Sequence, residues 1–178
     1  TAAKIGEGSV LDMVLSQDIL KIRRTLEETS REDFDRAVES VINAENIYIF
    51  GVRSSSSLAG FLGYYFDLIL GNVHIVTDSS RSGMYEALLR ISDKDAIIGI
   101  SFPRYSRTAA EAMTFAKSRG AATIAITDSL LSPLAQSAES VLIARSDMAS
   151  VVDSLVAPLS LINALIVATV IKKKDDVK

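Results

Sequence analysis

Apolar and polar positions alternate with two different spacings along this chain of 178 residues. Between residues 10 and 29, and again from Ser30 to Ile42, apolar side chains recur every three or four positions among charged ones, which predicts two helices. The motif Ser30-Arg-Glu-Asp33 is typical of a capping box and places the start of the second helix. From Ile47 onward, short β-branched runs predict strands instead.

These runs and the helical patterns between them predict an α/β fold. The predicted strands cover residues 47–50, 73–77, 96–100, 123–127 and 141–143, and helical spacing appears around 56–70, 82–91, 107–119 and 152–171, with a short helical turn near 133–137. Alternating strands and helices indicate a parallel sheet with helices on both faces. Because the strands lack strict polar alternation, we expect both of their faces to be buried. The prediction is one domain over residues 1–178, a three-layer α/β/α sandwich with a five-stranded parallel sheet and an N-terminal helical extension over about 1–34.

Composition narrows the possible functions. Hydrophobic residues make up 48% and charged residues 23%, and the formal net charge is −3. Such a chain lacks the basic surface expected of a nucleic-acid-binding domain. It contains no cysteine, which excludes disulfides and thiolate metal sites and is compatible with a reducing cytoplasm. The sequence begins with Thr and not Met, which we interpret as a sign of a trimmed or excised fragment.

The last apolar stretch raises the question of a membrane. Residues 151–171, followed by three lysines, would be long enough to span a bilayer. Asp153, Pro158 and Asn163 interrupt the stretch, and it follows an α/β pattern. We therefore favour a helix that is buried in the core or at a subunit interface, with a membrane span as the alternative.

Two hydroxyl-rich loops follow predicted strands and precede predicted helices. Four serines, Ser54 to Ser57, come after Gly51, and the second loop runs from Ser101 to Thr108. Such loops offer N–H groups, helix dipoles and hydroxyls to a phosphate, and arginine can bind phosphate in bidentate fashion. The alternative is that one serine caps each helix and the rest are solvated. The predicted phosphate-binding residues are Ser54, Ser55, Ser56, Ser101, Arg104, Ser106 and Thr108. Neither loop is a GxGxxG or Walker motif, which disfavours a dinucleotide or nucleoside triphosphate.

Three motifs resemble the sugar isomerase (SIS) domain, a phosphosugar-binding flavodoxin-like fold. The first motif of that family, roughly G-x-G-x-S-x-x-x-A, appears as Gly51-Val-Arg-Ser-Ser55-Ser-Ser-Leu-Ala59, with Arg53 in place of the second glycine. The S-x-S-G-x-T loop appears in altered form as Ser101-Phe-Pro-Arg-Tyr-Ser106-Arg-Thr108. The stretch from Ala116 to Ala135 is very similar to the one that follows in this family.

Within the family, the second loop looks like that of the effector domain of RpiR-type transcriptional regulators. This resemblance implies a cytoplasmic domain that senses a sugar phosphate and assembles as a homodimer or tetramer. We expect no cofactor and no metal. It also implies that DNA is bound only through an N-terminal helix-turn-helix domain, which we expect to be missing from this sequence. We expect the helix at 10–29 to connect to that domain, and the apolar stretch 151–171 to mediate subunit contact.

The sequence leaves three functions open: a sensor, an active aldose–ketose isomerase and an assembly module with a vestigial pocket. Isomerisation needs a base beside the sugar. The only histidine, His74, starts a predicted strand and so lies at the edge remote from the loops. Carboxylates near the loop edge are Asp78, Glu86, Glu111, Asp128, Asp147 and Asp153. Because they form no clear constellation with a base, we predict binding without turnover.

Overall fold

The computed structural model describes residues 7–147 and 152–176. Residues 1–6 of the expected N-terminal extension, and Val151 in the last apolar stretch, lie outside the described residues. The elements in chain order are α1 (Glu7–Glu28), α2 (Arg31–Asn43), β1 (Ile47–Gly51), α3 (Ser54–Leu70), β2 (Val73–Val76), α4 (Arg81–Ala87), β3 (Ala96–Ile100), α5 (Arg107–Ser118), β4 (Ala122–Thr127), the 3₁₀ turn η2 (Ala135–Ser137), β5 (Ser140–Ile143) and α6 (Val156–Asp176).

The five strands form one parallel sheet, in the order β2-β1-β3-β4-β5. Ile49 of β1 lies in register with Ile75 on one side and with Ile98 on the other. The chain thus adds a strand on one side of β1 and then crosses to the other side. In open α/β sheets ligands bind beyond the carboxyl ends of the strands at such a switch point, here between β1 and β3. The predicted fold class is confirmed.

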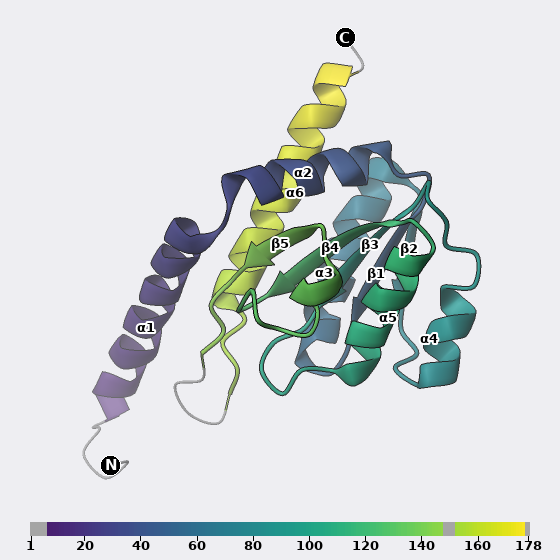
Figure 1. Cartoon of the computed structure of the whole chain (residues 1–178). Helices are drawn as coiled ribbons and strands as arrows, with labels where there is room; N and C mark the ends of the chain where they lie inside the picture. Colours follow the sequence, from purple (N-terminus) through teal and green to yellow (C-terminus); the bar gives the residue numbers. More distant parts are fainter. Residues whose placement is uncertain (1–6, 148–151, 177–178) are drawn as a thin grey trace.

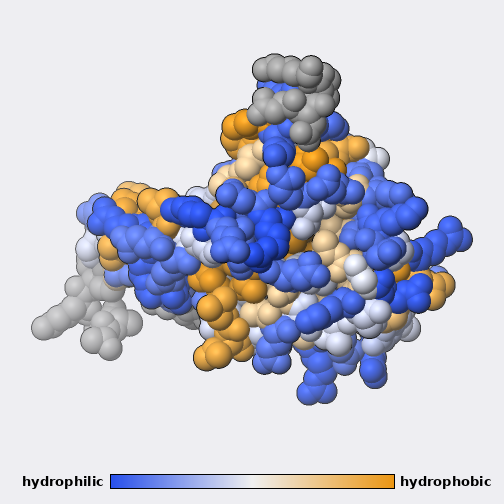
Figure 2. Space-filling model, turned by 45° about the horizontal axis from the view of Figure 1, so that its top comes forward, coloured by the Kyte–Doolittle hydropathy of each residue, from blue (hydrophilic) through white to orange (hydrophobic). Residues whose placement is uncertain are grey.

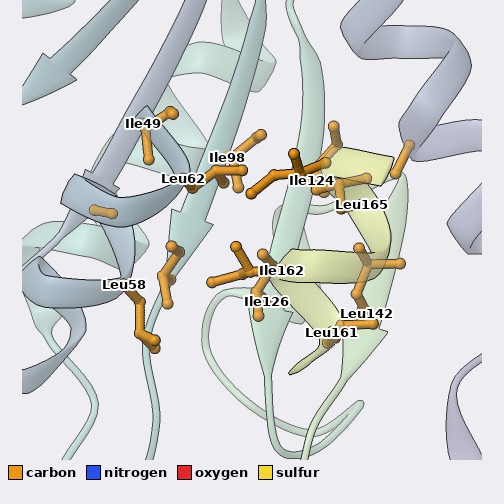
Figure 3. Close-up of a cluster of buried hydrophobic side chains, with 14 of the residues drawn as sticks. Ile49, Leu58, Leu62, Ile98, Ile124, Ile126, Leu142, Leu161, Ile162 and Leu165 are labelled. Carbon is orange, nitrogen blue, oxygen red and sulfur yellow. The ribbon is translucent and has the colours of Figure 1, made fainter. Parts of the chain in front are cut away.

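Helices cover both faces of the sheet (Figure 1). A hydrophobic core lies on each face. On one face, α2, α3 and α6 bury side chains such as Leu62 and Leu165 against the isoleucines of β1, β3 and β4 (Figure 3). On the other face, Met84 of α4 and Met113 of α5 pack against the opposite sides of the same strands. Successive strand residues point to opposite faces, so both faces must be apolar. The sheet is therefore held rigidly under its loops.

Helix ends follow the local sequence. The Ser30 hydroxyl accepts the backbone N–H of Asp33 at 3.1 Å, so the predicted start of α2 is confirmed. Gly71 ends α3 with a φ of 74°, a left-handed conformation that glycine adopts without strain. Three predicted helix bounds missed by four residues or more: α4 ends at Ala87, short of residue 91, and α6 begins at Val156, later than residue 152, and ends at Asp176, beyond residue 171.

The helices α6 and α1 are partly uncovered. By length and composition alone, Val156–Lys174 could cross a membrane, but Leu161, Ile162, Leu165 and Ile166 belong to the hydrophobic core. Val167 and Ile171 on the same helix are exposed. The helix α1 reaches away from the sandwich, and apolar residues gather on its surface and beside the C-terminal part of α6 (Figures 1 and 2).

Candidate functional site

The loops after β1 and β3 meet at the switch point and line a cavity of about 180 Å³. We call it the serine cavity. It is lined by Val52, Arg53, Ser54, Ser55, Ser101, Phe102, Pro103, Arg104, Ser106 and Asp153. Five of the seven predicted phosphate-binding residues are in this set. Ser56 and Thr108 lie in the first turns of α3 and α5 and are not among the lining residues.

The first loop brings α3 unusually close to β1. A Cβ placed on Gly51 would lie 2.6 Å from the carbonyl oxygen of Ser55, so only glycine permits this approach. Ser55 is 5% exposed and lines the cavity, yet its hydroxyl has no hydrogen-bond partner among the described residues. A free hydroxyl at the N-terminus of a 17-residue helix is therefore available to an anion.

The neighbouring serines differ in what their hydroxyls do. Ser54 donates to Oδ2 of Asp153 at 3.3 Å, across the cavity wall. Ser56 donates to the backbone carbonyl of Arg53 at 2.6 Å, which commits its proton to the helix start. The backbone N–H groups of Ser55 and Ser56 donate to the carbonyls of Val52 and Arg53. In this first turn a ligand would thus meet mainly the hydroxyls of Ser54 and Ser55.

The second loop is organised by its own serines. The Ser101 hydroxyl accepts the N–H of Ser106 at 3.1 Å, and the Ser106 hydroxyl accepts the N–H of Ala109 at 3.2 Å, capping α5. A hydroxyl that accepts one hydrogen bond still has its own proton to donate. Both residues are buried at the cavity, so they combine the capping role with two donors for a bound phosphate.

Tyr105 ties the second loop to the end of β4. Its hydroxyl donates to Oδ1 of Asp128 at 2.7 Å. Burial, followed by this hydrogen bond to a carboxylate, raises the pKa of Tyr105 to about 12. The phenol keeps its proton to a higher pH than an ordinary tyrosine, and its hydrogen bond to Asp128 holds the loop in place.

Asp153 is a lining residue that the predicted phosphate-binding set omits. It was expected inside a helix over 152–171, but α6 begins at Val156 and Asp153 lies in the segment before it. A carboxylate in this wall can accept hydroxyl groups of a sugar, as it accepts Ser54. Asp153 is 99 residues away from Ser54 in the sequence, so no local motif connects the two residues.

The other acidic residues and the histidine have structural partners or lie elsewhere. Asp78 accepts the N–H of Ser80, and hydrogen bonds from Ser80 lower the pKa of its carboxyl. Glu111 pairs with Arg81, Asp147 pairs with Arg24, and Glu86 lines a groove beside β2. His74 stacks on Tyr48 and hydrogen-bonds Asn46, away from the serine cavity. The described residues hold no cluster of three or more His, Cys, Asp or Glu side chains suited to a metal.

Comparison with known proteins settles the family. The model of the SIS domain matches residues 40–168, well over half of the chain. The chain belongs to the SIS domain family. An uncharacterised HTH-type transcriptional regulator of Caldanaerobacter subterraneus is 27% identical over 173 residues, which are 95% of this chain and 61% of that protein. The chain spans 43% of a second such regulator, from Haemophilus influenzae, so both relatives are considerably longer.

Solved structures agree with this assignment. The sugar isomerase domain of an RpiR transcription factor from Sphaerobacter thermophilus has a TM-score of 0.86 at 30% identity, over 92% of this chain and 90% of that one. Vibrio vulnificus NanR, solved with ManNAc-6P, has a TM-score of 0.83 at 22% identity, over 95% of this chain and 65% of that one. The phosphoheptose isomerase of Neisseria gonorrhoeae shares the fold, at 0.79 and 16%, over 92% and 99%. The SIS domain of this chain therefore resembles both regulators and isomerases in fold.

Proposed function

We propose that this chain is the phosphosugar-sensing effector domain of a bacterial transcriptional regulator of the RpiR type. The observation that carries the proposal is Ser55, whose hydroxyl has no hydrogen-bond partner among the described residues and which lines a cavity at the N-termini of α3 and α5. Ser101 and Ser106 would donate to the same phosphate, Ser54 would do so once its hydroxyl turns from Asp153, and Arg104 would add charge. NanR, a relative in fold, binds the sugar phosphate ManNAc-6P, which supports this ligand class.

Sensing is favoured over turnover by the surroundings of the cavity. Isomerisation needs a base that moves a proton between adjacent carbons. Asp153 is the lone titratable acid among the described residues that line the cavity, and it already accepts a hydroxyl from Ser54. The regulators that match this chain point in the same direction. The alternative, an aldose–ketose isomerase, is favoured by the fold shared with phosphoheptose isomerase.

A sensor must pass its state to the rest of the protein, and α1 supports such a route. The Thr25 hydroxyl accepts the N–H of Arg145 at 3.0 Å, and the Arg145 side chain pairs with Glu28. Beyond that point, the Ser154 hydroxyl donates to Oδ1 of Asp18 at 2.7 Å. In the sequence, Ser154 directly follows Asp153, the residue that lines the cavity. A ligand that binds Asp153 would thereby shift the contacts of α1, the helix expected to lead to the DNA-binding domain of a cytoplasmic regulator.

Replacing Ser55 with alanine tests the phosphate site. The affinity for sugar phosphates should fall by about ten- to a hundredfold, as expected for losing a hydrogen bond to a charged group. Isothermal calorimetry against a panel of hexose and pentose phosphates would measure it. At 100 times its dissociation constant a true ligand should stabilise the wild-type fold by about 2.7 kcal/mol.

Ser57→Ala is the matched control, because Ser57 is an exposed serine in the same turn of α3 that does not line the cavity. Equal affinities of the Ser55→Ala protein and wild type would refute the phosphate assignment. If the purified chain converts an aldose phosphate to a ketose phosphate, the protein is an isomerase and not only a sensor. Absence of binding across the panel would favour an assembly module.

A further inference from the structure

Two arginines beside the serine cavity have strained backbones. Arg53 has a φ of 55° and Arg104 a φ of 62°, and no other non-glycine residue among those described has a positive φ. Residues other than glycine rarely adopt a positive φ, because it strains the backbone. Residues strained in this way cluster at functional sites. A glycine would remove the strain at either position. An arginine at each of these strained positions is consistent with a role for the two guanidinium groups.

Both arginines also line a second, wider hollow next to the serine cavity. It has a volume of about 620 Å³ and is lined by Arg53, Arg104, Tyr105, Ser106, Arg107, Ala110 and Pro133. We call it the arginine hollow. Its lining holds three guanidinium groups and no carboxylate, beside apolar atoms of Ala110 and Pro133. A molecule held by the serines would have this hollow directly beside it, since Arg53, Arg104 and Ser106 line both spaces.

The three guanidinium groups are free to bind an anion. None of them forms an ion pair or hydrogen bond with any part of the chain that the structure describes, and all three lie around one hollow. Arg107 lines only the arginine hollow, so a phosphate in the serine cavity does not account for it. Cations without carboxylate partners beside apolar walls form a site for an anion.

We propose that Arg53, Arg104 and Arg107 form a second anion subsite and that the ligand is a sugar phosphate with a second anionic group, such as the carboxylate of a phosphorylated sugar acid. This inference rests on the proposed function, because the serines would hold the phosphate end. Guanidinium groups match the planar fork of a carboxylate. A second phosphoryl group could bind to the same guanidinium groups. The comparison of ligand pairs distinguishes a carboxylate from a second phosphoryl group.

Three matched pairs of ligands test the proposal by calorimetry on the whole chain. The pairs are glucose 6-phosphate with 6-phosphogluconate, ribose 5-phosphate with 5-phosphoribonate, and fructose 6-phosphate with fructose 1,6-bisphosphate. In at least one of the two pairs that contain a sugar acid, the acid should bind at least tenfold more tightly than the sugar phosphate without the carboxylate. A preference confined to the bisphosphate would overturn the carboxylate and assign the subsite to a second phosphoryl group.

Arg107→Gln should remove that preference by weakening mainly the binding of the member with the second anionic group, while the member without that group should bind with nearly its wild-type affinity. Arg107 is exposed at the start of α5, and glutamine is compatible with a helix, so the variant should fold, as its melting temperature would show. Lys117→Gln removes one exposed positive charge from the last turn of the same helix and should leave the preference intact.

The outcomes distinguish this inference from the proposed function. If both members of every pair bind equally, or if the preference survives Arg107→Gln, the second subsite is refuted while phosphosugar sensing stands. If neither member of any pair binds, both proposals fail.

Discussion

Arg53 is the residue at which stability and ligand binding should oppose each other. Its φ of 55° and ψ of −128° are free for glycine and cost other residues about 1–3 kcal/mol. Arg53→Gly also adds flexibility to the unfolded chain, which offsets part of the gain. We expect the free energy of unfolding in urea to rise by about 1 kcal/mol and the affinity for a sugar phosphate to fall.

Arg53→Ala is the control, because it removes the cation and keeps the strain. It should lose affinity to the same extent as Arg53→Gly without any gain in stability. A glycine variant less stable than wild type would show that the backbone of Arg53 is not strained.

Tyr105 should make the free energy of unfolding depend on pH in the alkaline range. Its pKa is about 12 in the folded state against 10.0 for a free phenol, so the folded state holds this proton more tightly. The resulting stabilisation is complete below pH 10 and is lost as the pH rises toward 12. Tyr105→Phe also deprives Asp128 of its hydrogen bond and should cost about 1 kcal/mol at pH 7.

Urea unfolding at pH 7 and at pH 11 would measure both effects. The difference between wild type and Tyr105→Phe should shrink at the higher pH. Tyr64→Phe changes a tyrosine that is 61% exposed and should leave stability nearly unchanged at both values. A constant difference across pH would mean that the Asp128 contact does not perturb the phenol.

The sequence predicted the serines of the site better than its charged residues. Ser54, Ser55, Ser101 and Ser106 could be placed together because the carboxyl ends of parallel strands share one edge of a sheet. Asp153 was expected at this edge only as one of six carboxylates, and its place in the cavity wall depends on where α6 begins. The strain at Arg53 left one signal, an arginine where the family motif has glycine.

At the scale of elements, strand positions were predictable because buried strands are continuous apolar runs. The start of α6 was missed although Pro158 marked it. Proline is tolerated in the first turn of a helix but removes a hydrogen bond in the interior. A helix from residue 152 would have placed Pro158 in its interior, whereas a start at Val156 places it in the first turn.

The contacts of α1 with the segment that contains Asp153 predict coupling between the site and this helix. Arg24 pairs with Asp147, and Ser154 donates to Asp18. In wild type, a bound sugar phosphate should slow hydrogen exchange in α1. The double variant Arg24→Gln with Ser154→Ala should lose at least half of this protection while still binding the ligand, because contacts on both sides of Asp153 are removed.

Arg23→Gln, which changes the exposed neighbour of Arg24, is the matched control and should keep the full effect. If the double variant shows undiminished protection of α1, the signal does not travel by these contacts.

At the scale of the whole molecule, the N-terminal half of α1 is not covered by the rest of the chain. Residues 9–17 are all exposed, and Lys21 is the first buried residue along the helix. Most of the stability of a helix in a protein comes from packing of its apolar side, so this side of α1 needs a cover. The exposed residues Leu11, Leu15 and Ile19 recur at spacings of four on this side. A second copy of the chain, joined also through Val167 and Ile171 of α6, would provide that cover.

We therefore expect a homodimer, or a tetramer built from it, in light scattering at micromolar concentration. Leu15→Glu combined with Ile19→Glu should produce a monomer, because two charges would have to be buried without partners. Leu89→Glu is the control: Leu89 is 67% exposed and follows α4 on the opposite face of the sheet from α6, so the assembly should survive. A monomeric wild-type chain would assign the apolar side of α1 to another domain, and dimers that persist in the double variant would assign the contact to α6 alone.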